Sequence, residues 1–372
     1  MRFQPLRGRA LALFFTIGVS LKLWHETGMI EREVAIYNEL SKYFKNIYFF
    51  TYGTEDFKFK SYLADNITII SKKYIKNDLL YSFLLPFIHR KILKEVDVLK
   101  TNQMLGSWSA AVAKLIYRKK LVVRTGYMWS IHLGKENAKR WRRILSKNIE
   151  KLVYRLADSA VTSSQTNFEY VEHYYKPRDH ILIPNYVETD VFKPLNMAKK
   201  KGSICFVGRL TSQKNLLALF EALSGLPYTI DLIGSGEHEE KLKEFARENK
   251  TDASFLGNVP NHDLPAILNQ HELFILPSLY EGMPKTLLEA MACGLAVIGT
   301  NIDGTREVIK HGENGILCET DPKSIREAIV RVIEDEGLKQ TLGINARKTI
   351  EQRFSLEKLT DKELGLYVKL LI

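Results

Sequence analysis

The 372-residue sequence has no long hydrophobic run, few cysteines and no tract of biased composition. Its longest apolar run, residues 10–21, is 12 residues long. A membrane-spanning helix needs roughly 18 or more such residues. A signal peptide is disfavoured at the same place, because no small-residue cleavage site follows the run. We therefore expect these residues to form a buried first strand, and we expect no segment that crosses a bilayer.

The three cysteines, Cys205, Cys293 and Cys318, lie among apolar or small residues and lack the spacing of metal ligands. An odd number with this spacing argues against a disulfide framework and against a zinc site. The absence of a Pro-, Gly- or Ser-rich tract argues against disorder. These features predict reduced core thiols in a cytoplasmic globular protein.

Positive charge is concentrated in the first half of the chain. The formal net charge is +11, and residues 1–185 carry 31 Lys and Arg against 16 Asp and Glu, whereas residues 186–372 carry 23 against 27. A basic half suits a nucleic acid, an anionic membrane surface or an acidic substrate. Charge alone does not choose among these partners.

The length predicts two domains, and in both halves strand-like runs alternate with helical patterns. The expected strands are residues 10–17, 46–52, 67–70, 96–101, 120–125, 159–164 and 180–185, then 203–208, 228–234, 253–257, 272–277, 296–300 and 315–319. The expected helices include residues 31–44, 107–119 and 139–157, then one from about 213, 238–248, 284–293, 322–335 and 339–370. Continuous apolar strands alternating with helices are typical of parallel sheets covered on both faces. The predicted fold class is α/β, with two Rossmann-like doubly wound domains.

A break in this alternation marks the domain boundary. We expect an N-terminal domain over 1–190, a linker over 191–202 with Pro194 and a lysine run, and a C-terminal domain over 203–355. Residues 356–372 are predicted to form a helix that packs back on the N-terminal domain. Two such domains would face a central cleft with the carboxyl ends of their strands, where α/β folds bind ligands.

The segment LYEGMPKTLLEAMACG, residues 279–294, places acids at both ends of an apolar helix. It follows the expected strand 272–277 and therefore lies at a carboxyl edge of a sheet. Pro284 suits a first helical turn and Gly294 suits the position after the last one, so the first turn would offer N–H groups to a phosphate. Glu281 and Glu289 would accept hydrogen bonds from sugar hydroxyls. The alternative is that neither acid binds a ligand: Glu281 would be favoured near the positive end of the helix dipole, and Glu289 would be exposed to solvent.

The segment SICFVGRLTSQKN, residues 203–215, offers two cations across a strand-to-helix turn. Arg209 and Lys214 are five positions apart and can both face an anion above that turn. Taken singly, each residue is more often a solvated surface charge.

Several motifs together resemble the family-4 retaining glycosyltransferases, which have the two-Rossmann GT-B architecture. They are GRLTSQKN, IGSGEHEEKLKEFA, FLGNVPNHDL, the long stretch from LPSLYEGMPKTLLEAMACG to GILCE, and RFSLEKL. The resemblance covers about residues 180–365, and its most specific parts are the Glu-x7-Glu helix and the upstream Gly-Arg and Lys.

The resemblance implies a role for each matching residue. Glu281 would contact hydroxyls of the donor sugar and Glu289 those of the ribose, while Arg209 and Lys214 would neutralise the diphosphate of the departing nucleotide. The remaining donor-side positions are the entrance of the helix, Gly282, Met283, Pro284, Lys285 and Thr286, and the nucleobase-flanking Gly234 and Val259.

The resemblance also bears on cofactors. The sequence has no Asp-x-Asp motif, which agrees with a metal-independent reaction. We expect no cofactor, and a UDP- or GDP-linked sugar as co-substrate. In NIDGTREVI, residues 301–309, Asp303 occupies the position of the first glycine in the family's Gly-Gly-x-x-Glu loop. We therefore expect Glu307 to have a structural role or to support residues that contact the ligand, without contacting the ligand itself.

The N-terminal half matches the family less well. Residues 17–28 stand where a glycine-rich loop is common, and Arg124 with Thr125 and Gly126 stands where a His-Gly pair is common. The acceptor-side candidates are Gly18, His25, Arg124 and His132. A lone histidine is more often a packing or surface residue, and the leaving phosphate can itself take the acceptor's proton.

Residues 139–155 carry seven Lys or Arg among apolar residues. A basic amphipathic helix of this kind can lie on an anionic membrane. The alternative is a core-packed helix with a cationic outer face. The first reading would make the protein peripheral on the inner face of the cell membrane.

These observations predict a retaining glycosyltransferase that moves a sugar from a nucleotide donor to a saccharide or lipid-linked saccharide. The expected setting is the biosynthesis of a surface polysaccharide, such as lipopolysaccharide, or of a glycoconjugate. A sugar-nucleotide epimerase on the same fold is the main alternative. A nucleic-acid-binding protein is disfavoured, because no segment resembles a known nucleic-acid module.

Overall fold

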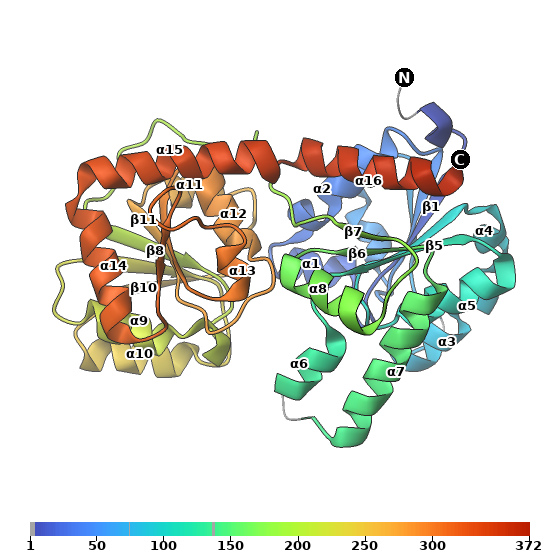
Figure 1. Ribbon diagram of the computed structural model, residues 1–372, viewed down its shortest axis with the longest axis horizontal. Helices are drawn as coiled ribbons and strands as arrows, with labels where there is room; N and C mark the ends of the chain where they lie inside the picture. Colours follow the sequence, from blue (N-terminus) through green and yellow to red (C-terminus); the bar gives the residue numbers. More distant parts are fainter. Residues whose placement is uncertain (1–3, 74, 136–137) are drawn as a thin grey trace. The chain divides into compact units, whose positions relative to one another are not determined.

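Figure 1 shows the computed structural model, which describes residues 4–73, 75–135 and 138–372. The chain forms two compact units. Unit 1 comprises Met1–Pro184 and Leu359–Ile372, and unit 2 comprises Asn185–Lys358. Each unit contains one parallel sheet with helices on both faces, which confirms the predicted fold class.

Unit 1 contains a seven-stranded sheet in the order β3-β2-β1-β4-β5-β6-β7, and every neighbouring pair is parallel. Its strands are β1 Ala10–Phe14, β2 Asn46–Phe50, β3 Ile67–Ile70, β4 Val98–Thr101, β5 Lys120–Thr125, β6 Ser159–Thr162 and β7 His180–Leu182. All five residues of β1 are buried, as expected for a central strand covered on both faces.

The helices of unit 1 connect these strands, except for α16, which enters the unit at the end of the chain (Figure 1). They are α1 Leu21–Glu26, α2 Ile30–Ser41, α3 Asp78–Ile88, α4 Arg90–Glu95, α5 Ser107–Tyr117, α6 Trp129–Lys135, α7 Arg140–Leu156, α8 Gln165–Tyr174 and α16 Leu356–Leu371, with 3₁₀ turns η1 Gln4–Leu6 and η2 Asp56–Tyr62. None of α1, α3, α4, α6 and α8 was named in the sequence analysis.

Unit 2 contains a six-stranded parallel sheet in the order β10-β9-β8-β11-β12-β13. Its strands are β8 Ser203–Val207, β9 Thr229–Ile233, β10 Asp252–Gly257, β11 Leu273–Leu276, β12 Ala296–Thr300 and β13 Ile316–Cys318. The order reverses between β8 and β11, and the carboxyl ends of strands at such a reversal are where open α/β sheets bind ligands.

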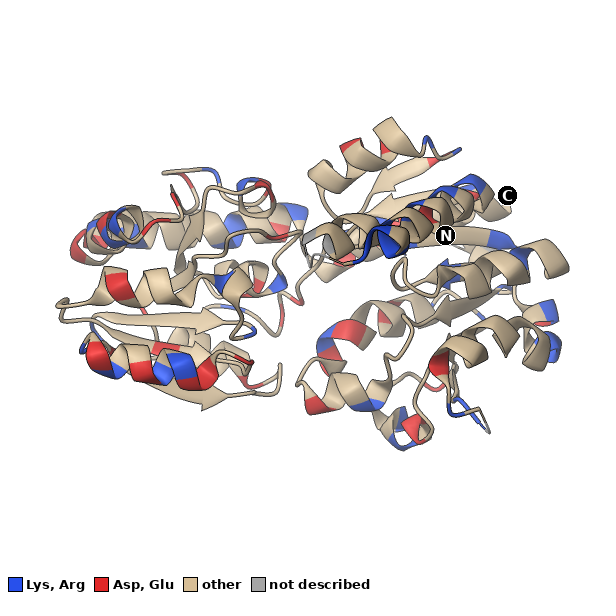
Figure 2. Ribbon diagram, turned by 90° about the horizontal axis from the view of Figure 1, so that it is seen from below, with Lys and Arg blue, Asp and Glu red and all other residues tan. Residues whose placement is uncertain are grey.

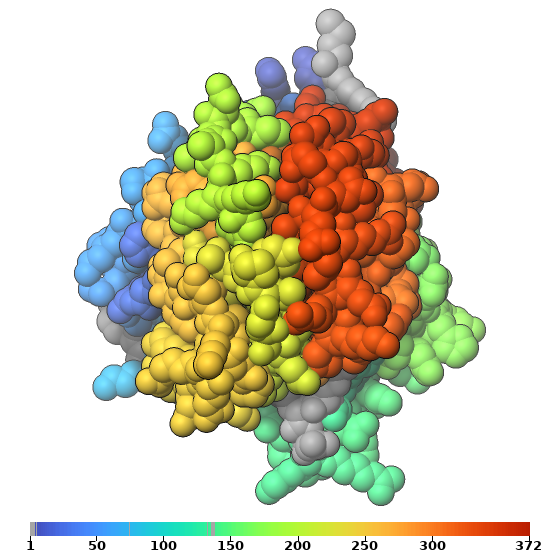
Figure 3. Space-filling model, turned by 90° about the vertical axis from the view of Figure 1, so that its left-hand side faces the viewer, coloured from blue at the N-terminus to red at the C-terminus, as the bar shows by residue number. Residues whose placement is uncertain are grey.

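The helices of unit 2 are α9 Leu216–Leu223, α10 Glu239–Glu248, α11 Leu264–Asn269, α12 Lys285–Ala292, α13 Asp303–Arg306, α14 Pro322–Glu334 and α15 Glu336–Arg353, with a 3₁₀ turn η3 Ser212–Lys214. Helix α14 packs beside α9 on the face of unit 2 that Figure 3 presents. Helix α12 packs on α15 and on the strands β11 and β12, and its residues Leu287, Leu288, Ala290 and Met291 are buried in the core of the unit.

The single long helix predicted over 339–370 is wrong, because the chain forms two helices separated by Phe354 and Ser355. The Phe354 carbonyl accepts a hydrogen bond from the Val187 N–H at 2.9 Å, and the Leu356 N–H donates to the Val187 carbonyl at 2.9 Å. The backbone groups of Phe354 and Leu356 that bond to Val187 cannot also bond within a helix, so α15 ends at this point.

The unit boundaries differ from the boundaries drawn on the sequence. Phe192, at the start of the proposed linker, is buried in the core of unit 2, and its carbonyl accepts a hydrogen bond from Arg347 at 2.6 Å. At the other end of the chain, α16 contributes Glu363 and Tyr367 to the buried interior of unit 1, where Glu363 pairs with Lys100 of β4.

Candidate active site

Two loops at the carboxyl edge of the sheet in unit 2 lie in direct backbone contact. Gly208, which follows β8, donates its N–H to the Ile233 carbonyl at 2.9 Å. Gly234 has a φ of +129°, and a Cβ there would lie 2.1 Å from the Gly208 carbonyl oxygen. Only glycine tolerates both the dihedral angle and this approach. Gly234 therefore allows the turns after β8 and β9 to meet under the two predicted cations.

The two predicted cations differ in their surroundings. Arg209 is exposed, and its guanidinium makes no hydrogen bond or ion pair within the described parts of the chain. Lys214 ends the 3₁₀ turn η3, and its side chain is only 11% exposed. An exposed guanidinium beside a partly buried ammonium can serve as a two-point contact for a diphosphate.

Lys214 forms an ion pair with Glu281, a residue 67 positions away in the loop that follows β11. The Glu281 carboxylate also accepts a hydrogen bond from Ser278 Oγ at 2.7 Å. The two loops are joined further by the Leu279 N–H, which donates to the Gln213 carbonyl at 2.9 Å. The fold thus brings together a cation and an acid that the sequence analysis assigned to the same donor.

The helix α12 begins beside this ion pair. Pro284 is its N-cap residue, with a ψ of 108°, and Lys285 and Thr286 form the start of its first turn. The first N–H groups of a helix have no intrahelical partner and carry partial positive charge. Met283 is held at this entrance, because its carbonyl accepts a hydrogen bond from Asn185 Nδ2 at 2.8 Å.

Glu289 lies one turn further along α12 and is only 2% exposed, so it is not the solvated acid of the alternative reading. One of its carboxylate oxygens accepts a hydrogen bond from Asn261 Nδ2 at 3.1 Å. Asn261, itself buried, follows β10 in the same loop as the half-buried Val259. No sequence motif marks Asn261, although NVPN in this loop was one of the matching segments.

Gly304 is a second residue that the sequence analysis did not single out. A Cβ at this position would lie 2.2 Å from the Gly282 carbonyl oxygen and 2.8 Å from that of Glu281. The loop after β12 therefore presses directly on the backbone that carries Glu281. Asp303 opens the short helix α13 and pairs with Arg306, and Glu307 is the C-cap of that helix.

The acceptor-side candidates lie in unit 1 and are not joined into one cluster. Gly18 follows β1 with a φ of +77°, and His25 on α1 meets the Tyr62 hydroxyl at 3.2 Å through Nδ1. Arg124 lies near the end of β5, where its N–H donates to Thr101 Oγ1 at 3.0 Å. His132 belongs to α6, but its side chain lies outside the described residues.

The basic helix predicted over 139–155 corresponds to α7. Its buried face consists of Ser146, Glu150, Val153 and Tyr154, so it packs on unit 1 along one side. Lys and Arg occur on several separate elements of unit 1 in Figure 2, and the positive charge of this half is therefore not confined to α7. Within the described residues, no helix is long and apolar enough to cross a membrane.

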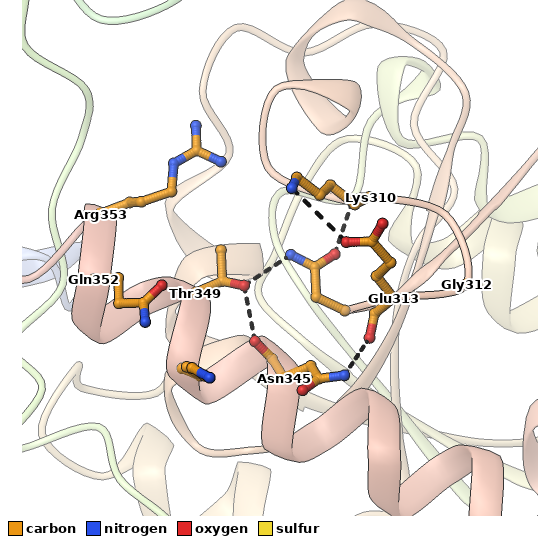
Figure 4. A pocket seen from close by; sticks show the side chains of 9 residues that line it. Lys310, Gly312, Glu313, Asn345, Thr349, Gln352 and Arg353 are labelled. Carbon is orange, nitrogen blue, oxygen red and sulfur yellow. Dashed lines mark hydrogen bonds and ion pairs between the residues drawn. The ribbon is translucent and has the colours of Figure 1, made fainter.

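A polar pocket of about 460 Å³ lies elsewhere on unit 2, between the segment that precedes β13 and helix α15 (Figure 4). Asn345 Nδ2 donates to the Glu313 carbonyl at 2.8 Å across it, and Asn314 Nδ2 meets Thr349 Oγ1 at 3.0 Å. The pocket adjoins the amino end of β13, whereas ligands of this fold bind at carboxyl ends. None of the predicted site residues lines it.

The cysteines and the acids supply no further reactive centre. Burial raises the pKa of the Cys293 and Cys318 thiols to about 12, so both remain protonated at neutral pH and are poor nucleophiles. Across residues 4–73, 75–135 and 138–372, no group of three His, Cys, Asp or Glu side chains is arranged to hold a metal ion.

Known proteins that are similar to this chain are glycosyltransferases. Residues 187–349, a little under half of the chain, match the sequence profile of the glycosyl transferases group 1. An uncharacterised glycosyltransferase of Methanocaldococcus jannaschii is 27% identical over 73% of this chain and 73% of its own. The UDP-Gal:alpha-D-GlcNAc-diphosphoundecaprenol alpha-1,3-galactosyltransferase of Escherichia coli is 33% identical over 54% of this chain, and the match spans only 57% of that relative.

Solved structures extend the likeness to both units. HepE of Anabaena, determined in complex with UDP and glucose, has a TM-score of 0.80 over 97% of this chain and 100% of its own, at 18% identity. At this identity the likeness establishes the fold, which is GT-B. The profile and the relatives support a glycosyltransferase on that fold.

Proposed function

We propose that this protein is a retaining glycosyltransferase that transfers a sugar from a nucleoside-diphosphate donor without a metal ion. The observation that carries the proposal is the meeting of Lys214 and Glu281, from two different loops, beside the first turn of α12. A sugar diphosphate offers hydroxyls for the carboxylate and anionic oxygens for the ammonium. One ligand can therefore engage both partners of the ion pair.

The donor would lie along the carboxyl edge of the sheet in unit 2. Glu281 would accept hydrogen bonds from the sugar, and Glu289, oriented by Asn261, would accept those of the ribose. Arg209, Lys214 and the N–H groups at the start of α12 would surround the diphosphate between them. Gly234 and Val259, in the loops after β9 and β10, would flank the nucleobase.

The chemistry needed at this site is the stabilisation of a departing nucleoside diphosphate. As the bond from the sugar to the diphosphate breaks, negative charge grows on the leaving oxygen. Two cations and the positive end of a helix, all at one edge of the sheet, would lower the energy of that state. The leaving diphosphate can take the acceptor's proton, which would remove the need for a protein base.

The acceptor is proposed to be a saccharide or a lipid-linked saccharide. The E. coli relative acts, by its name, on a diphosphoundecaprenol-linked sugar with a UDP-linked donor. We extend that chemistry to this chain as a proposal, in the assembly of a surface polysaccharide or glycoconjugate. The buried thiols of Cys205, Cys293 and Cys318 suit the reducing, cytoplasmic setting in which nucleotide sugars are used.

The test is a panel of UDP-, GDP- and ADP-linked sugars incubated with the full chain, with and without saccharide and lipid-linked acceptors. We expect release of one nucleoside diphosphate that depends on the acceptor, and a product whose anomeric configuration by NMR equals that of the donor. Inverted products would refute the retaining mechanism. Inversion at carbon 2 of the sugar without acceptor-dependent release would identify an epimerase instead.

A further inference from the structure

Helix α3 exposes a continuous apolar stripe. Six large hydrophobic side chains on it are between 37% and 56% exposed: Leu79, Leu80, Phe83, Leu84, Phe87 and Ile88. The opposite side, with Tyr81, Ser82, Leu85 and Pro86, is buried. A helix that is apolar all round is normally buried all round. Half of α3 therefore lacks a covering partner among the described residues.

The stripe is not the outer side of a loosely attached helix. Trp108 Nε1 of α5 donates to Ser82 Oγ at 3.0 Å, and the Tyr117 hydroxyl, also of α5, donates to the Pro86 carbonyl at 2.8 Å. The rings of Phe83 and Trp108 stack with their centroids 5.7 Å apart. The two hydrogen bonds fix the buried side of α3 on α5, and the ring stack holds one edge of the stripe, so the rest of the stripe faces outward.

The two neighbouring helices in unit 1 add to this surface. Helix α5 packs against both α3 and α7. It exposes Leu115 and Ile116 near its end, and α7 exposes four large side chains away from its buried Ser146 and Glu150: Trp141, Ile144, Leu145 and Leu152. Exposed apolar side chains that gather on neighbouring helices are a feature of interaction surfaces.

Cations border the stripe at both ends of α3. Lys73 and Lys76 precede the helix, Arg90, Lys91 and Lys94 follow it, and all five are exposed. The acid in the first turn of α3, Asp78, is paired with Lys72. A second copy of the chain docked stripe to stripe would bring like charges together, whereas an anionic lipid surface complements both the apolar side chains and the cations.

We propose that unit 1 docks on an anionic lipid bilayer through the stripe of α3, with the cations at the two ends of the helix contacting lipid headgroups. The apolar side chains would enter the boundary between headgroups and acyl chains. Stable anchoring of a peripheral protein takes two signals, and the stripe and its cations supply one each. This inference goes beyond the proposed function and does not depend on it. It assigns the surface that enters the bilayer to α3, and α7 would lie beside that surface.

The test is co-sedimentation of the full chain with vesicles of phosphatidylglycerol and phosphatidylcholine, and with vesicles of phosphatidylcholine alone. We expect binding to the first kind and weak or no binding to the second. The double variant Leu80→Gln/Phe87→Gln should lose at least about tenfold in affinity for anionic vesicles, which corresponds to about 1.4 kcal/mol. The matched control is Leu256→Gln/Ile344→Gln, which removes two exposed apolar side chains from unit 2 and should bind as the wild type does.

A second pair of variants tests the cations. Lys76→Gln/Lys91→Gln should lose roughly fivefold per charge removed, since each Lys near an anionic surface contributes about 1 kcal/mol. Added salt should also weaken the binding of the wild type to anionic vesicles, because it screens the same attraction. Lys241→Gln/Lys323→Gln, which removes two exposed lysines of unit 2, should change nothing.

Several results would overturn the proposal. The wild type could fail to bind anionic vesicles, or the α3 variant could bind them as well as the wild type. Loss of binding only in Trp141→Gln/Leu152→Gln would move the surface to α7. A concentration-dependent dimer that the α3 variant abolishes would show that a second copy covers the stripe. Nucleoside diphosphate release with a soluble acceptor is measured in parallel, and it should be unchanged in the α3 variant.

Discussion

Each unit contains a Lys–Glu ion pair between residues far apart in the sequence, and the two pairs have different surroundings. In unit 1, Lys100 on β4 pairs with Glu363 on α16, and their side chains are 2% and 4% exposed. In unit 2, Lys214 pairs with Glu281, and their side chains are 11% and 10% exposed. The chemistry of the pair is the same, so its surroundings decide what it can do.

The pair in unit 1 is enclosed by protein. The Lys100 ammonium lies 4.8 Å from the centroid of the Tyr37 ring, and the Tyr367 hydroxyl donates to Glu363 at 2.5 Å. Burial lowers the pKa of Lys100 and raises that of Tyr367. The two side chains are almost fully enclosed, so we infer that this pair serves to hold α16 to the sheet.

The pair in unit 2 lies at a carboxyl edge, in the loops that carry the exposed Arg209 and lead into α12. Ser278 would remain as a partner for Glu281 if Lys214 turned toward an anion. We infer that this second pair is an exchangeable one, whose members separate to take the two halves of one ligand. The comparison teaches that place and enclosure, more than residue type, distinguish a binding pair from a structural pair.

The largest expected effect comes from breaking the enclosed pair. Glu363→Ala leaves the Lys100 ammonium buried without a counter-charge, which should cost about 3–5 kcal/mol of unfolding free energy. Replacing both partners, Lys100→Met/Glu363→Met, should recover most of that loss. Urea denaturation measures both, and turnover per folded molecule should stay at the wild-type level. A large loss of turnover in the stable double variant would remove the distinction between the pairs.

Breaking the pair in unit 2 should instead affect chemistry. Lys214→Ala removes the cation proposed to meet the leaving group and should lower kcat by roughly 100- to 1,000-fold. The matched control is Lys114→Ala, because Lys114 forms a comparably buried ion pair with Asp158 in unit 1. Steady-state kinetics should separate the two lysines. Equal turnover in the two variants would contradict the proposed role of Lys214.

A third variant tests how the backbone beneath Glu281 is positioned. Gly304→Ala places a methyl group where the Gly282 carbonyl stands, so the loop must move, at a cost of about 1–3 kcal/mol. A shift of about 1 Å at a reacting centre can cost roughly 100-fold in rate. Gly365→Ala is the control, since its Cβ meets nothing within 4 Å on α16, and it should stabilise by up to about 1 kcal/mol. Normal kinetics in Gly304→Ala would show that the contact is dispensable.

The smallest expected effect is a pH dependence in unit 1. Burial lowers the pKa of His89, which meets the Tyr81 hydroxyl at 3.1 Å, from 6.5 to about 4. Between these values the unfolded chain binds a proton that the folded chain does not, so this stability is present above pH 6.5 and is lost as pH falls toward 4. Thermal melting of wild type and His89→Gln over that range should show the steeper loss in the wild type. Parallel curves would contradict the assignment.

The strands were predictable because buried parallel strands carry a local signature. The observed β3, β5 and β12 coincide with the ranges 67–70, 120–125 and 296–300, and most other strands differ only by end residues. Helix α3 was missed because a short apolar segment with Pro86 has no amphipathic period to distinguish it from a loop or strand. The exposure of its stripe depends on which neighbours cover it, and a local pattern does not contain that information.

For the candidate site, the sequence analysis named the charged residues and placed them at the carboxyl edge of the sheet in unit 2. It could not predict that Lys214 and Glu281 form a pair, because a contact across 67 positions is made by the order of the strands. Asn261 and Gly304 were missed for a related reason. One acts by a hydrogen bond to a distant helix and the other by the absence of a side chain, and neither leaves a motif.

The central claim is that Glu281 and Glu289 hold different parts of one donor. It is tested most directly by titrating Glu281→Gln and Glu289→Gln with the nucleotide sugar identified by the donor panel and with its nucleoside diphosphate alone. A hydrogen bond to a charged group contributes about 1.5–3 kcal/mol, or roughly 10- to 100-fold in Kd. Glu289→Gln should weaken both ligands by the same factor, whereas Glu281→Gln should weaken only the nucleotide sugar. Equal factors for both ligands in Glu281→Gln would contradict the account.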